Sequence, residues 1–229
     1  MCAHLRAGFL QSYQHPPLRE FMLCRSRQIL YSHPRNIGGF TVEANMPLAI
    51  APHFNQGTLP VAFVFSVPGA AELAERRPVA GDTGMNLTLA LRSLVANEPR
   101  LFRSLDRYAY RITNAFDSPM AKSLKSGASE AKAAQILDAS NIKRVIKEVQ
   151  DCEVVVLCGR KAHLLTNEVA RTSVTVVHAW HLGNRALIGK YNGEEVRSAP
   201  TAAVRRELRV AQWAEELVWA IRANAHTKM

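Results

Sequence analysis

The sequence of 229 residues lacks several features that mark whole classes of protein. No apolar run approaches the roughly 20 residues of a membrane-spanning helix, and no signal-peptide core with a cleavage site opens the chain. Its four cysteines (Cys2, Cys24, Cys152 and Cys158) include no Cys-x-x-Cys pair. We therefore expect reduced thiols, with no metal, iron–sulfur cluster or other cofactor, in a soluble protein of the bacterial cytoplasm or nucleoid.

Acidic residues are also scarce, with 19 against 29 lysines and arginines, for a net charge of +10. This excess favours a polyanionic partner, and we expect DNA before a membrane because no strongly amphipathic basic helix stands at either end. The alternative is that the charge serves solubility alone. We expect a basic arm over residues 1–45, which contacts phosphate or covers the fold, and a monomeric domain over residues 46–229.

Apolar, β-branched runs alternate with helical patterns along this domain. Residues 61–67, 108–115, 153–158 and 173–180 are predicted strands. Residues 86–97, 129–150, 160–170 and a stretch opened by Pro200 are predicted helices, and residues 129–150 form either one helix or two that divide near Asn141. The alternation predicts an α/β fold, a three-layer α/β/α sandwich around a central, mainly parallel four-stranded sheet. In the last helix, Trp213 and Trp219 are expected to pack in the core.

Polar side chains gather where the predicted strands end. Glu72 and Asp82 follow the first strand, Asn114 ends the second and His181 follows the fourth. Because the carboxyl ends of parallel strands meet at one sheet edge, we expect these side chains to lie close together. An amide can bind a base edge, an imidazole can stabilise developing negative charge, and a carboxylate can position water.

Each of these residues also has a structural alternative. Asn114 and Asp82 are common turn residues, and Glu72 favours the start of a helical turn. His178 is expected to lie in the core or behind the site.

Four stretches resemble motifs of the uracil-DNA glycosylase superfamily, in the same order and spacing over residues 60–190. Residues 68–84, PGAAELAERRPVAGDTG, resemble the first motif of its iron–sulfur branch. Residues 110–115, YRITNA, resemble its strand ending in Thr-Asn, and residues 153–165 its strand-to-helix step. His181 falls where the family has its His-Pro-Ser motif.

The resemblance implies an enzyme that flips a nucleotide out of DNA and hydrolyses its N-glycosidic bond without a lysine nucleophile. By this resemblance Asn114 reads the base, His181 stabilises the departing base, and Asp82 or Glu72 orients water and balances an oxocarbenium-like sugar. It further implies a base pocket formed by Val67, Pro68, Gly69 and Val79. The residues that bind DNA would be Arg77, Arg185 and Lys190.

The chain departs from the family at its catalytic position. Val67 and Ser66 precede Pro68 where the family carries a polar catalytic group, and Val79 replaces a phenylalanine that would stack on the base. An inactive, nucleic-acid-binding member is therefore the main alternative. An unrelated α/β enzyme acting on nucleotides is a further one.

The residues after Pro68 are small, Gly69-Ala70-Ala71, and leave room for a substituent at C5 of a pyrimidine. We therefore expect the substrate to be uracil, a C5-modified cytosine, or both. DNA repair and the destruction of foreign or phage DNA both remain open as biological roles.

Overall fold

The computed structural model describes residues 51–124 and 127–226. The predicted arm over residues 1–45 and its boundary lie outside the described residues. Four strands form one sheet in the order β2-β1-β3-β4, and every neighbouring pair is parallel. The strands are β1 (Val61–Phe65), β2 (Arg111–Asn114), β3 (Val154–Cys158) and β4 (Thr175–Ala179). The predicted α/β sandwich with a parallel four-stranded sheet is confirmed.

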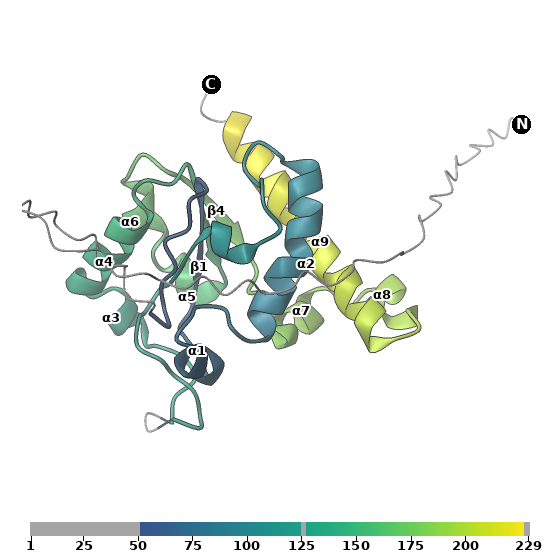
Figure 1. The fold of residues 1–229 in the computed structure, drawn as a ribbon, viewed down its shortest axis with the longest axis horizontal. Coiled ribbons are helices and arrows are strands. Elements are labelled where there is room, and N and C mark those ends of the chain that lie inside the picture. Colours follow the sequence, from purple (N-terminus) through teal and green to yellow (C-terminus); the bar gives the residue numbers. More distant parts are fainter. Residues whose placement is uncertain (1–50, 125–126, 227–229) are drawn as a thin grey trace, which may run out of the picture. The chain divides into compact units, whose positions relative to one another are not determined.

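Helices cover both faces of this sheet. The α-helices are α1 (Ala70–Glu75), α2 (Asp82–Asn97), α3 (Ala133–Ile136), α4 (Ala139–Val149), α5 (Arg160–His163), α6 (Thr166–Ala170), α7 (Asn184–Lys190), α8 (Glu194–Ser198) and α9 (Ala202–His226), with a 3₁₀ turn, η1 (Arg107–Ala109). Figure 1 shows α4 and α6 on one side of the strands and α2 and α9 on the other. No helix in residues 51–124 and 127–226 is long and apolar enough to cross a membrane.

Successive side chains of β1 point to opposite faces of the sheet and pack in two separate cores. Phe63 and Phe65 face the core that contains α2 and α9, whereas Val64 faces the core that contains α4 and α6. Every residue of β1 and β3 is buried, which explains why both read as continuous apolar runs. Cys152 and Cys158 are buried free thiols, as expected.

The predicted helices differ from the observed ones at their ends and breaks. Of the two possibilities for residues 129–150, the structure has two helices, α3 and α4, because the Asp138 carboxylate accepts a hydrogen bond from the Ser140 N–H and starts α4. The helix predicted over residues 160–170 is likewise divided, into α5 and α6.

The two tryptophans of α9 have opposite environments. Trp213 is 1% exposed, as predicted, but Trp219 is 71% exposed, and its predicted place in the core is wrong. Six residues do not complete a whole number of helical turns, so the two side chains leave α9 in different directions.

The turn from Val79 into α2 depends on a glycine. A Cβ at Gly84 would lie 1.7 Å from the Val79 carbonyl oxygen, and Val79 itself has a φ of +46°. We predict that Gly84→Ala lowers the free energy of unfolding by about 3 kcal/mol, because the backbone must move. The matched variant is Gly189→Ala in α7, where a Cβ meets nothing within 4 Å. It should raise that free energy by up to about 1 kcal/mol. Urea unfolding measures both, and equal effects would refute the steric explanation.

Candidate functional site

The ends of three strands meet at one edge of the sheet. Phe65 ends β1 and pairs in register with Asn114, which ends β2. The Phe65 ring contacts the His181 ring edge to face, with centroids 5.8 Å apart and an angle of 76° between the planes. Loops from β1, β2 and β4 are thus brought together, as the predicted parallel order requires.

His181 is held in a defined orientation at this edge. Its Nδ1 accepts a hydrogen bond of 2.9 Å from the Gly183 N–H, so the neutral ring carries its proton on Nε2. On its other side lies Gly159, where a Cβ would come within 2.9 Å of the His181 Cβ. Gly159 also has a φ of +90°, which favours glycine. A side chain here would displace the imidazole.

Burial lowers the pKa of His181, and the negative charges of Glu130 and Glu72 offset only part of that effect. The ring is therefore neutral at pH 7 and presents an Nε2–H donor rather than a charge. This arrangement suits a group that must stabilise negative charge by hydrogen bonding.

Asp82 is tied to the His181 loop by a chain of side-chain amides. Its Oδ2 accepts a 3.0 Å hydrogen bond from the Asn184 Nδ2, and the Asn184 Oδ1 accepts one of 3.0 Å from Asn86. Asn86 is fully buried and also donates to the Leu182 carbonyl at 2.6 Å. The Asp82 side chain remains 58% exposed, so it is accessible from solvent.

Arg206 of α9 closes this network from the other side. Its Nε donates to the Asn86 Oδ1 at 2.5 Å, and its Nη2 donates to the Asp82 carbonyl at 3.3 Å. The N-terminus of α2, the loop after β4 and α9 are therefore fixed in one arrangement, which holds Asp82 beside the segment that carries His181.

Glu72 has a structural task. Its Oε2 accepts a 2.9 Å hydrogen bond from the Gly69 N–H and caps the N-terminus of α1. This is the alternative that the sequence offered for Glu72. Its charge nevertheless acts on His181, since it raises the pKa of that imidazole.

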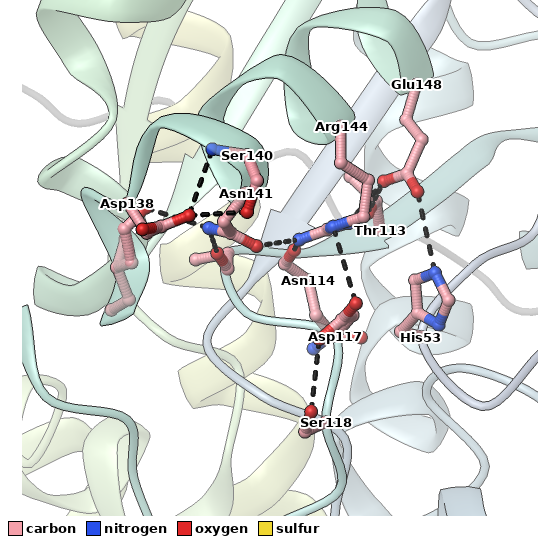
Figure 2. Close-up of polar contacts among 12 residues, drawn as sticks. His53, Thr113, Asn114, Asp117, Ser118, Asp138, Ser140, Asn141, Arg144 and Glu148 are labelled. Carbon is pink, nitrogen blue, oxygen red and sulfur yellow. Dashed lines mark hydrogen bonds and ion pairs between the residues drawn. The ribbon is translucent and has the colours of Figure 1, made fainter. Parts of the chain in front are cut away.

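Asn114 is 4% exposed, and residues of α4 anchor its backbone. The Arg144 Nη2 donates to the Asn114 carbonyl at 3.0 Å, and the Asn141 Nδ2 donates to the Ala115 carbonyl at 2.7 Å. Figure 2 shows Arg144 between Asn114, Asn141 and Glu148. Arg144 and Glu148 form a 2.6 Å ion pair. Within the described part of the chain, no hydrogen bond engages the Asn114 side-chain amide.

The remaining predicted residues lie around this edge in different environments. Pro68 is buried, Val67 and Gly69 are partly buried, and Val79 packs in the same core as Phe65.

Two of the three basic residues predicted to bind DNA have partners within the protein. The Arg77 guanidinium lies 3.8 Å from the centroid of the Tyr108 ring. The Lys190 ammonium lies 3.5 Å from the Glu216 carboxylate. Arg185 is exposed, four residues beyond His181. Of the three, Arg185 is the one for which the described residues provide no ion pair or ring contact.

His178 does not lie in the core. It is exposed, its ring stacks on His163 with centroids 4.5 Å apart, and its Nε2 lies 2.8 Å from the Thr166 Oγ1. The outward direction of this side chain on the edge strand β4 accounts for the difference.

Ser66 stands near the family's catalytic position, where its hydroxyl is a poor substitute for a carboxylate. Its Oγ is buried and has no hydrogen-bond partner, one of three such side-chain atoms in the described residues. A buried polar atom without a partner carries a cost in stability and needs an explanation. Here it directly follows Phe65, so a ligand at the sheet edge is one group that could satisfy it.

We predict that stability falls in mildly acidic solution because of His181. Its pKa is lowered from 6.5 on folding, so the unfolded chain takes up the proton first. The contribution of the neutral ring is therefore fully present above about pH 6.5 and is lost as the pH falls through the folded pKa. His181→Gln should flatten this dependence in melting temperatures measured between about pH 5 and pH 8. An unchanged pH profile would mean that another group is responsible.

Within the described residues, one cavity lies beside the carboxyl end of β2, where Asn141 and Arg144 line it, and another lies between β4 and α9. The two cavities, of about 420 and 430 Å³, are lined by other residues than Asp82, Asn114 and His181. Within residues 51–124 and 127–226, no group of three or more His, Cys, Asp or Glu side chains could hold a metal ion.

The sequence matches no known protein-family model, and no curated protein is significantly similar to it.

Proposed function

We propose that this protein is a monofunctional DNA glycosylase of the uracil-DNA glycosylase superfamily. It would hydrolyse the N-glycosidic bond of an everted pyrimidine, uracil or a C5-modified cytosine, and leave an abasic site. The observation that carries the proposal is a neutral imidazole, His181, held at the same sheet edge as Asn114 and Asp82. We further propose that it acts as a monomer in the bacterial cytoplasm or nucleoid.

Each of these groups has one part in the reaction. The Nε2–H of His181 donates a hydrogen bond to the carbonyl oxygen on which negative charge develops as the base departs. The Asn114 amide, with a donor and an acceptor, binds the edge of the pyrimidine. The base leaves with the electrons of the glycosidic bond and finally takes a proton, while the oxygen of water bonds to C1′ of the sugar.

The Asp82 carboxylate is the acid that we assign to the sugar. It is exposed at the N-terminus of α2 and fixed by Asn184, whereas the Glu72 carboxylate caps α1. A carboxylate beside an oxocarbenium-like centre stabilises its positive charge and can orient the attacking water. This role needs no protonation of Asp82.

Substrate choice rests on the small residues after Pro68. Ala70 and Ala71 are exposed and bring no bulk to the site. A pyrimidine with a C5 substituent therefore meets less steric hindrance than it would against an aromatic ring. Net charge of +10 and the exposed Arg185 favour binding to the phosphates on either side of the extruded nucleotide.

A catalytically inactive DNA-binding protein is the second candidate, and Val67 is the observation that favours it. Val67 stands directly before Pro68 and has no polar atom in its side chain. It packs against the core that contains α4 and α6. In this case the site would bind an everted base without hydrolysing its bond.

Formation of abasic sites by the unmodified protein separates the two candidates, and Asp82→Asn then tests the assigned acid. Duplexes containing uracil or a 5-substituted cytosine are incubated with each variant and scored for alkali-labile sites. We expect Asp82→Asn to lower excision by about 100-fold while DNA affinity is retained. The control is Asp151→Asn, a 73% exposed carboxylate just before β3, at the other end of the strands, which should leave excision unchanged. Equal activity of Asp82→Asn and the unmodified protein would remove Asp82 from the mechanism.

A further inference from the structure

The second cavity, of about 430 Å³, lies between the edge strand β4 and helix α9 and has aromatic walls. All three tryptophans of the chain, Trp180, Trp213 and Trp219, line it together with Tyr191 and Glu216. Trp180 is 45% and Trp219 71% exposed. Large aromatic side chains that gather at an accessible cavity indicate a binding surface.

The walls of this cavity are fixed by hydrogen bonds. The Trp213 indole N–H donates to the Trp180 carbonyl at 2.7 Å. The Tyr191 hydroxyl donates to the Glu216 Oε2 at 2.7 Å. The Trp213 and Tyr191 rings and the Glu216 carboxylate are therefore held in place before any ligand arrives, which lowers the cost of ordering them.

A cation of the protein already lies against these groups. The Lys190 ammonium is 5.4 Å from the Trp180 ring centroid, 5.9 Å from the Tyr191 ring centroid and 3.5 Å from the Glu216 Oε1. Aromatic faces attract cations through the ring quadrupole, and a carboxylate adds a full opposite charge. Among the residues that line the cavity, Glu216 is the carboxylate that an organic cation would meet, and His163 and His178 line it as well.

We propose that this cavity binds a small organic cation of the methylated ammonium class. Methylation spreads the charge and weakens hydration, so such an ion exchanges water for ring faces at little cost. The cavity volume lies in the range of small-molecule sites. None of Asp82, Asn114 and His181 lines the cavity, so this proposal stands apart from the glycosylase activity.

Tryptophan fluorescence reports on this cavity directly, because every tryptophan of the chain lines it. The probe is choline, titrated into the full chain, and the matched control is its uncharged isostere 3,3-dimethylbutan-1-ol. We expect a saturable change in fluorescence with choline and none with the isostere at the same concentrations. An equal response to both compounds would show an apolar cavity without preference for charge and would overturn the proposal.

Three variants locate the bound ion. Trp219→Ala should weaken choline binding about tenfold, and the exposure of Trp219 means that folding does not depend on it. Glu216→Gln keeps an acceptor for the Tyr191 hydroxyl but removes the charge, and should weaken binding about fivefold. Lys190→Met removes the competing ammonium and should strengthen binding.

Two results would reject the cation site. One is the absence of saturable choline binding in both the unmodified protein and Lys190→Met. The other is a salt-sensitive response to oligothymidine that Glu216→Gln increases, since this would identify the cavity as a surface for nucleic-acid bases. Calorimetric titration of choline provides the same affinities without the fluorescent reporter.

Discussion

Replacing His181 with alanine should lower the single-turnover rate of base excision by about 100- to 1,000-fold. The reason is the loss of the Nε2–H donor at the sheet edge, where the ring is fixed by the Gly183 N–H and the Phe65 ring. His181→Gln restores an N–H donor on a side chain of similar reach and should recover part of the rate. Rates are measured with enzyme in excess over a labelled duplex.

The control for this experiment is His178→Gln. His178 lies on β4 but stacks on His163 and lies close to Thr166, away from the Phe65 ring. Its replacement should leave excision unchanged. Equal losses from the two replacements would show a general effect on the strand rather than a role for the His181 imidazole.

Replacing Arg144 with methionine should lower the free energy of unfolding by about 3–5 kcal/mol. Arg144 and Glu148 form a 2.6 Å pair whose side chains are only 19% and 12% exposed. Without the guanidinium, the partly buried Glu148 carboxylate keeps a weaker set of partners, and the Asn114 and Asn141 oxygens lose donors. Urea unfolding gives the loss, and the double variant Arg144→Met, Glu148→Gln should recover part of it.

A surface pair provides the contrast. Arg100 and Glu153 also form a close ion pair, but their side chains are 71% and 45% exposed. Arg100→Met should cost no more than about 1 kcal/mol, because water replaces the lost partner. If both replacements had the same small effect, the cluster in Figure 2 would not anchor the end of β2.

The sheet could be predicted from sequence because its strands carry a strong local signal. Residues 61–65 and 154–158 are buried on both faces and contain only apolar residues, which no surface helix would have. Parallel order followed from the helices between them. The meeting of Asn114 and His181 at one edge then followed from topology alone.

What could not be predicted depends on contacts between distant residues. Asn86 reaches Asn184 and Arg206, which are 98 and 120 positions away, and nothing near Asn86 in the sequence marks it. The short helices α1, α7 and α8 have too few turns for an apolar period to be recognised. Trp219 was misplaced because a tryptophan in a helical pattern indicates burial, whereas its direction depends on how α9 lies on β4.

The most direct test of the central claim is the identity of what the protein releases from DNA. Duplexes that carry uracil, 5-substituted cytosines or unmodified bases are incubated with the protein, and the products are analysed by mass spectrometry. The mechanism predicts a free pyrimidine and a strand that is lighter by the mass of that base less one water, with an intact backbone until alkali is added. Intact strands from every duplex, at protein concentrations that saturate DNA binding, would contradict it.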